Sequence, residues 1–145
     1  MDNTLVYNRI PEGFYRTLFE LLKLHQDIIP VLKDELNSII SEDAAALDEC
    51  LKSLQALTLR IRATESQSEK ILKENGLSAD ILSDSIRQMP EAEQSPYHSL
   101  KAQFSDNLRE ITFYRDKCGV MLKTRLSRLD RQPRAAGPQS FEITV

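Results

Sequence analysis

Apolar residues recur at alternating spacings of three and four along most of this chain, which is the period of one buried stripe on an α-helix. One such run lies within residues 41–76, and comparable runs cover residues 11–40 and about 96–131. A helix of the length of the middle run, roughly 50 Å at about 1.5 Å per residue, is unstable alone in water and requires partner helices. The apolar residues of the middle run are Leu47, Leu51, Leu54, Leu57, Ile61, Ile71 and Leu72.

The residue types at the two ends of the middle run indicate where that helix begins and ends. Ser41 is the expected N-cap, with Glu42 and Asp43 in the first turn, where their side chains satisfy and neutralise free amides. Asn75 and Gly76 tolerate the left-handed conformation that ends many helices. The connection to the preceding helix is then only two or three residues long, which forces the two helices to lie antiparallel.

The first helix is expected to begin at Pro11, a residue that suits the first turn, and to continue to about Ile40. Pro30 interrupts it, and an interior proline removes a hydrogen bond and crowds the preceding turn. Because the stripe keeps its phase on both sides, we expect a kink at Pro30, with a full break as the alternative. The predicted stripe runs through Phe14, Leu18, Leu21 or Leu22, His25, Ile28 or Ile29, Leu32, Leu36 and Ile39.

Beyond Gly76 the chain is predicted to form a short helix that Ser78 caps and that Met89-Pro90 ends. Asp80 is expected in its first turn, and Ile81, Leu82 and Ile86 are expected to point inward. Residues 91–96 are predicted to be a polar connection. The last helix should begin near Pro96 and run to about Arg131, with a stripe through Leu100, Phe104, Leu108, Ile111, Arg115, Cys118, Leu122, Leu126 and Leu129.

The fold class that follows is all-α, an elongated antiparallel helical bundle or coiled coil with three long helices and one short helix. Residues 11–131 form the bundle domain, residues 1–10 an irregular N-terminus, and residues 132–145 a C-terminal tail whose composition is that of a flexible linker. Residues 1–13 lack the features of a signal peptide, and no window approaches the about 20 apolar residues of a membrane span. We therefore expect a cytoplasmic protein without membrane insertion.

Charge is unevenly distributed along the chain. The first 50 residues carry 4 basic and 10 acidic side chains, whereas residues 101–145 carry 9 basic and 5 acidic ones. Antiparallel packing of the first and last helices would bring these opposite charges together. Neutralisation within one bundle is therefore favoured over a nucleic-acid surface, for which the sequence also lacks a groove-reading motif.

The sequence contains no residue pattern that points to catalysis. There is no glycine-rich phosphate loop, no serine elbow and no pair of cysteines at CxxC spacing. His25 lies on an apolar stripe without partners at ligand spacing, so we interpret it as a packed structural residue and not a metal ligand. Cys50 and Cys118 fall on predicted stripes and are expected to act as small buried hydrophobes. We expect a non-enzymatic protein with no cofactor and no metal.

The last predicted helix carries more apolar residues than one buried stripe requires. At about 100° per residue, Ile111 and Cys118 share the inner face, whereas Phe113 and Val120 point almost to the opposite side. Two interpretations stay open. Either the bundle or a homodimer encloses this helix, or Phe113 and Val120 help to present a docking surface for another protein.

The end of the same helix is basic and amphipathic, because Lys123, Arg125 and Arg128 alternate with Leu126 and Leu129. Such a segment suits coupled folding and binding. The candidate partner-binding residues are Phe113, Tyr114, Val120, Met121, Leu126 and Leu129.

The order of these elements resembles the FlgN family of flagellar export chaperones over roughly Phe14 to Arg131. The resemblance lies in the leucine-rich segment 18–24, the segment 35–40 with the acidic turn after it, and the long second helix with its Lys-Glu-Asn-Gly exit. A short helix that Leu77-Ser78 introduces and a long last helix complete it. The last helix departs from the family pattern, since only Asn107 stands where a seam of asparagines is expected.

The resemblance implies a cytoplasmic chaperone that binds flagellar hook-associated proteins, those of the hook–filament junction, and delivers them to the type III export apparatus. It also implies that clients bind at the carboxyl-terminal helix and tail, where the excess of apolar residues lies. The competing interpretations are a structural coiled-coil module that forms a homodimer and, with less support, a basic-helix bundle that binds nucleic acid.

Overall fold

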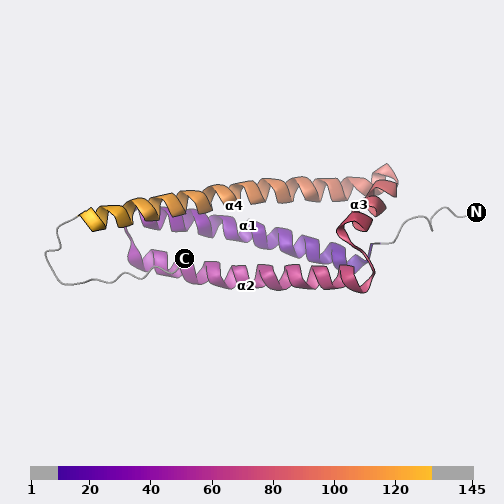
Figure 1. Cartoon of the computed structure of the whole chain (residues 1–145), viewed down its shortest axis with the longest axis horizontal. Helices are drawn as coiled ribbons and strands as arrows, with labels where there is room; N and C mark the ends of the chain where they lie inside the picture. The colour runs from indigo at the N-terminus through magenta and orange to yellow at the C-terminus, as the bar shows by residue number, and fades with distance from the viewer. Residues whose placement is uncertain (1–9, 132–145) are drawn as a thin grey trace, which may run out of the picture.

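A computed structural model describes residues 10–131, which fold into four helices (Figure 1). Helix α1 spans Glu12–Ile40, α2 spans Ala44–Glu74, α3 spans Ala79–Gln88 and α4 spans Glu91–Arg131. The three long helices lie lengthwise beside one another, and α3 lies at one end of the molecule (Figure 1). The described residues contain no strand, so the all-α class with three long helices and one short helix is confirmed. Apart from Ile10, the predicted irregular N-terminus and the predicted tail lie outside these residues.

Helices α1 and α2 form the predicted antiparallel hairpin, with three residues between them. Helix α1 continues through Pro30 without a break. Pro30 is exposed, so the backbone carbonyl that loses its partner there lies on the side of the helix that water reaches. The stripe predicted for α1 is buried or half-buried along its whole length.

The turn between α1 and α2 differs from the prediction, because Asp43 and not Ser41 caps α2. The Asp43 carboxylate accepts a hydrogen bond from the backbone N–H of Ala46 at 3.0 Å. Ser41 ends α1, and its hydroxyl donates to the Asn37 carbonyl at 2.8 Å. Glu42, with a φ of 58°, takes the left-handed position that glycine usually holds after a helix. This position shifts the cap of α2 by two residues.

The opposite end of α2 is built as predicted, around Gly76. Gly76 has a φ of 65°, and the Leu77 N–H donates to the Leu72 carbonyl at 2.8 Å, which closes the last turn of the helix. Ser78 caps α3 by accepting from the Ile81 N–H at 3.3 Å. The inward direction predicted for Ile81 is wrong, since this side chain is 38% exposed and Ser85 is the buried residue of α3.

Helix α4 begins at Glu91, so the prediction that residues 91–96 form a connection is wrong. The Gln94 side chain donates to the carbonyls of Arg87 at 3.1 Å and Met89 at 2.6 Å, and so satisfies the end of α3 from within the second turn of α4. Pro96 costs α4 only the bond to the Ala92 carbonyl, and Ala92 is exposed, so water can replace the missing donor.

Helices α1 and α4 run parallel, contrary to the antiparallel packing that the charge distribution suggested (Figure 1). The ring centroids of Tyr15 and Tyr97 lie 5.4 Å apart near the start of both helices, and Lys33 pairs with Glu110 at 3.5 Å further along. Neutralisation still occurs, because the basic end of α4 meets the acidic turn between α1 and α2 through an ion pair from Arg125.

The core lies around α1, which contributes most of the buried side chains. A central cluster joins Ile28, Ile29 and Leu32 of α1 to Ile111 of α4. Helix α2 buries only Thr64 and Ser68, and its leucines are half-buried or exposed. On α4 the inward direction predicted for four residues of the stripe is wrong, because these residues are exposed: Leu108, Arg115, Leu126 and Leu129.

Candidate partner-binding surface

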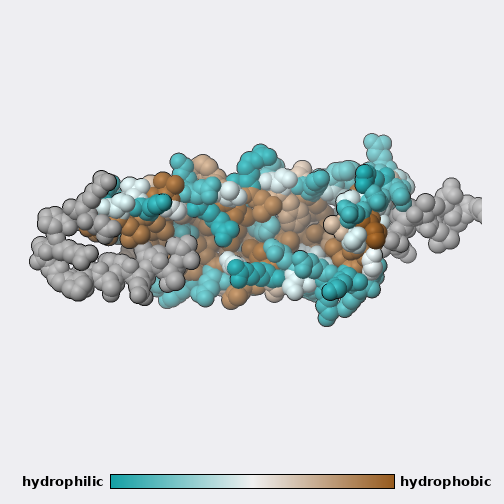
Figure 2. All heavy atoms as spheres, in the orientation of Figure 1, coloured by the Kyte–Doolittle hydropathy of each residue, from teal (hydrophilic) through white to brown (hydrophobic). Residues whose placement is uncertain are grey.

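Much of the apolar surface of this bundle is not covered by the residues that the structure describes. Figure 2 shows hydrophobic residues gathered along the middle of one face, between more polar margins. On α4, Phe113 is 53% exposed and Val120 is 62% exposed. The interpretation in which the described part of one chain encloses these two residues is therefore wrong. Any cover for these two residues must come from outside residues 10–131.

Phe113 and Val120 form an outer ridge, the name used below for these two residues. The ring of Phe113 lies edge-on to Tyr114, with centroids 5.2 Å apart, and the ammonium of Lys117 lies 5.7 Å from the Phe113 centroid. Tyr114 itself is half-buried against the central cluster. The ridge is thus a fixed apolar surface with a cation beside it.

The six predicted residues do not form one continuous patch. Leu126 and Leu129 lie about 120–180° around α4 from the outer ridge at about 100° per residue, and both line a groove beside the turn between α1 and α2. Met121 is half-buried next to Leu122, a residue of the groove wall. The predicted site therefore falls on two surfaces of α4.

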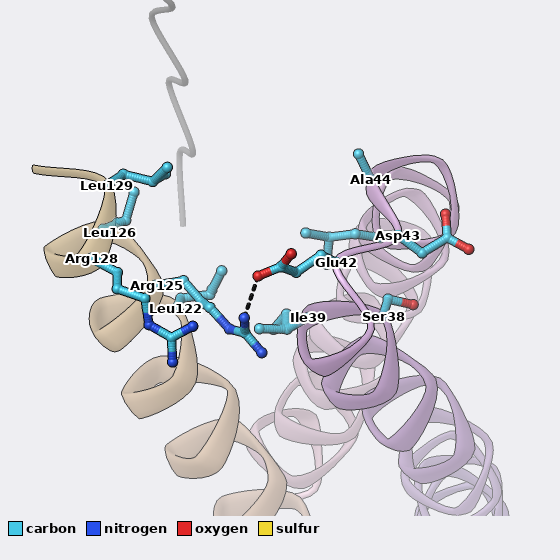
Figure 3. Close-up of a pocket in the computed structure, with 11 residues that line it drawn as sticks. Ser38, Ile39, Glu42, Asp43, Ala44, Leu122, Arg125, Leu126, Arg128 and Leu129 are labelled. Carbon is cyan, nitrogen blue, oxygen red and sulfur yellow. Dashed lines mark hydrogen bonds and ion pairs between the residues drawn. The ribbon is translucent and has the colours of Figure 1, made fainter. Parts of the chain in front are cut away.

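The terminal groove has a volume of about 440 Å³ and is open to solvent at the end of the bundle (Figure 3). One wall is α4, and the other is the end of α1 with the start of α2. Leu126 is 41% exposed and Leu129 is 54% exposed, so this groove is apolar and incompletely filled. The apolar residues that line it are Ile39, Ala44, Leu47, Leu122, Leu126 and Leu129.

Arg125 fixes the two walls of the terminal groove relative to each other. Its guanidinium group pairs with the Glu42 carboxylate and also donates to the Ile40 carbonyl at 3.0 Å (Figure 3). Only 23% of the Arg125 side chain is exposed. Arg128 also lines the groove, so the apolar walls carry cationic groups at this end.

The titratable groups inside the bundle are packed against neighbouring side chains. His25 is buried, as predicted, with its ring edge-on to Phe104 at a centroid distance of 5.6 Å. Burial lowers the pKa of His25, and the nearby Glu65 carboxylate opposes this shift. Burial also raises the pKa of the Glu35 carboxyl and raises that of the Cys118 thiol to about 12. No group of three or more metal-ligating side chains occurs among residues 10–131.

Sequence reasoning found the outer ridge but missed the role of Ile39 and Leu47 in the terminal groove. Both were assigned to the buried stripes of their helices, and the spacing does support that assignment. A stripe shows only that a helix needs cover. It does not show which part of the stripe the rest of the chain leaves open.

The described residues form a helical bundle whose longest helix keeps apolar side chains exposed on two surfaces, an arrangement typical of proteins that bind other proteins. The family model for FlgN protein matches residues 12–140, and the chain belongs to the FlgN family of flagellar export chaperones. This is a family of chaperones and not of enzymes. No match is found among curated proteins or among solved structures. None of the helices within residues 10–131 is both long and apolar enough to cross a membrane.

Proposed function

We propose that this chain is a cytoplasmic chaperone that binds hook-associated proteins of the flagellar hook–filament junction and escorts them to the type III export apparatus. Family membership supports the general role in flagellar export. The observation that carries the more specific proposal is the exposure of apolar side chains on α4, above all Phe113 and Val120. Exposed apolar surface of this kind marks sites where proteins meet.

The mechanism is coupled folding and binding. The client's terminal helices pack onto the two surfaces of α4 described above, which hides these helices from premature assembly. Six residues contribute to the two surfaces. Burying two or three side chains supplies several kcal/mol, at roughly 1.5–3 kcal/mol each, and the entropy of ordering the client offsets part of that gain. The resulting affinity is moderate, which suits a protein that must release its cargo. The six residues are Phe113, Tyr114, Val120, Met121, Leu126 and Leu129.

Isothermal titration calorimetry with the carboxyl-terminal helical fragment of a junction protein tests the proposal. The variant that combines Phe113→Asp with Val120→Asp should bind the fragment at least about 10-fold more weakly, because the bound client would bury the carboxylate of each new aspartate. Leu59→Asp is the matched control, since Leu59 is 60% exposed and lies on α2. Failure of the wild-type chain to bind any junction-protein fragment would count against the function.

A structural homodimer is the second candidate, because the same exposed residues would also be covered by another copy. Analytical ultracentrifugation of the purified chain, alone and with the junction-protein fragment, separates the two functions. A tight dimer that persists in the variant with Asp at positions 113 and 120, and that ignores the fragment, would favour the structural module. Nucleic-acid binding is less well supported, because the Arg125 guanidinium, one of the basic groups that could contact phosphates, already pairs with Glu42. Steep loss of binding with salt would be its signature.

A further inference from the structure

The long helices of this bundle leave one side of α1 open. Helix α1 packs closely against both α2 and α4, whereas α2 and α4 do not approach each other closely anywhere in the described residues. The band of apolar surface in Figure 2 lies between these two helices. Three helices with this arrangement occupy three positions of a four-helix bundle and leave the fourth position, opposite α1, vacant.

The sides of α2 and α4 that face this vacant position carry apolar residues at helical spacing. On α2, Leu51 lies one turn after Leu47, which lines the terminal groove, and it is 38% exposed. On α4, Leu108 lies five full turns before Leu126 and therefore on the same face, and it is 48% exposed. Apolar residues on the same faces of α2 and α4 thus extend beyond the terminal groove, with the exposed Arg115 between Leu108 and Leu122, and the space between these two faces is called the channel. Its full rims are Leu47, Leu51 and Leu54 on α2 and Leu108, Leu122 and Leu126 on α4.

Helix α2 shows most directly that this channel needs an occupant. Its two buried residues are the small polar Thr64 and Ser68. Leu54, Leu57 and Ile61 are only partly buried against the central cluster. An amphipathic helix that buries its threonine and serine more deeply than its leucines has part of its apolar face directed away from the existing core.

The spacing and the charge of the channel indicate the chemistry of the occupant. The α2 rim repeats every three to four residues, and on α4 Leu122 and Leu126 are four residues apart with Leu108 on the same face, a spacing that matches the i, i+3, i+4 anchors of an amphipathic helix, whereas a strand presents side chains with a period of two. At the terminal groove, Glu42 pairs with Arg125 and Asp43 caps α2, so Arg128 is the cation that the lining residues offer to a partner. A carboxylate on the occupant would pair with it.

A second copy of the chain fits this channel less well than a partner helix does. In a dimer whose two-fold axis passes through the channel, channel would face channel and neither would be filled. The outer ridge of one copy could enter the channel of another, but such a head-to-tail contact forms a ring only if the rotation between copies closes, and otherwise builds open chains. A single helix from another protein fills the vacancy without either consequence.

We infer that the channel between α2 and α4 binds one amphipathic helix of the client, with an acidic residue at the end that meets Arg128, and that this helix completes a four-helix bundle. The inference deepens the proposed chaperone function and rests on it. It also gives the two surfaces of α4 different roles, because the client helix lies in the channel and the outer ridge lies outside it.

Titration calorimetry with the full chain and the carboxyl-terminal helical fragment of a junction protein tests the inference. The double variant Leu51→Glu with Leu108→Glu should bind about 10- to 100-fold more weakly, because each new carboxylate would be buried beneath the bound helix. Leu59→Glu is the matched control, about 120° around α2 from Leu47, and should bind within about 2-fold of the wild type. Arg128→Glu should weaken binding about 3- to 10-fold, and replacing the client's acidic residue by lysine should restore it.

A photo-crosslinking amino acid at position 108 gives a readout that does not depend on affinity. It should link to the client fragment, whereas the same group at position 59 should not. Wild-type affinity in the double variant, together with loss of binding on Phe113→Asp and Val120→Asp, would place the client on the outer ridge and overturn the inference while the chaperone function stands. Self-association that Leu51→Glu abolishes would overturn it in favour of a second copy. If no junction-protein fragment binds the wild-type chain, the proposed function fails and the inference fails with it.

Discussion

Arg125 of α4 pairs with Glu42, the residue that stands in the left-handed conformation between α1 and α2. The same guanidinium group donates to the Ile40 carbonyl at 3.0 Å, one of the carbonyls that the end of α1 leaves without a helical partner. A side chain on the last helix therefore both caps the first helix and holds the turn after it. This contact sets the wall of the terminal groove, because Glu42 and Arg125 both line it.

Substitution at position 42 should separate the backbone cost of this turn from the value of the ion pair. Glu42→Ala loses the pair, worth about 0.2–1 kcal/mol for exposed partners, and keeps a Cβ at a φ of 58°. Glu42→Gly also loses the pair but relieves the left-handed conformation, which costs about 1–2 kcal/mol for a residue with a Cβ. Glycine also adds entropy to the unfolded chain, which offsets part of this gain. We therefore expect the free energy of unfolding, measured in urea, to be about 1 kcal/mol higher for the Gly variant than for the Ala variant. Equal stability of the two variants would show that the turn is not strained.

Leu24 should be among the most costly side chains to truncate. It is 2% exposed and is the largest fully buried side chain among the described residues. Leu24→Ala should lower the free energy of unfolding by about 2–5 kcal/mol, through lost burial and the cavity left behind. The matched substitution Leu59→Ala, at a side chain that is 60% exposed, should change it by no more than about 0.5 kcal/mol. Comparable losses at the two sites, measured by denaturant titration, would contradict the burial described above.

Mild acid should destabilise the bundle through His25. Burial holds the pKa of this ring below its ordinary value of 6.5, so the unfolded chain takes up the proton first as the pH falls. The free energy of unfolding should therefore decrease once the pH drops below about 6.5, by at most about 1.4 kcal/mol per pH unit, and level off below the folded-state pKa. His25→Gln should remove this contribution, and His98→Gln, at an exposed ring, should keep it.

For each histidine variant, the free energy of unfolding is compared with that of the wild type at the same pH. Burial raises the pKa of Glu35 above its ordinary value of 4.5, so this carboxyl has the opposite effect and weakens the fold as the pH rises through that range. The Cys118 thiol and the Arg115 guanidinium each oppose part of the Glu35 shift. A wild-type curve that runs parallel to the His25→Gln curve from pH 7.5 to 5.5 would rule out the role given to His25.

Cys118 should resist thiol reagents in the folded protein. The residue is 3% exposed, and burial together with the nearby Glu35 carboxylate raises the pKa of its thiol to about 12, so almost no thiolate is present at neutral pH. Cys50 is half-buried and should be modified first. Mass spectrometry after timed alkylation measures both sites. Full modification in urea is the control, and native-state modification of Cys118 as fast as that of Cys50 would show that α4 separates from α1 readily.

Local chemistry explains which features of this fold could be predicted from the sequence. Gly76 and Ser78 act within four residues of their own position, through a missing Cβ and a hydroxyl that accepts a backbone N–H, so their roles follow from residue type alone. The direction of Phe113 and Val120 follows from helical geometry, which places them opposite Ile111 and Cys118, whereas their exposure depends on which elements pack around the helix. Their part in binding a client stays a prediction.

Contacts between residues far apart in the chain decided the features that could not be predicted from the sequence. Glu42 stands in a left-handed position where its carboxylate meets Arg125, 83 residues further on, and no pattern near Ser41 contains that information. The sequence alone determined that this chain forms long amphipathic helices with more apolar surface than one stripe needs. Only the tertiary structure decided that α4 runs parallel to α1 and that α2 and α4 stay apart. The physical reason is that periodicity specifies which face of a helix must be covered, whereas the covering element is set by packing across the whole chain.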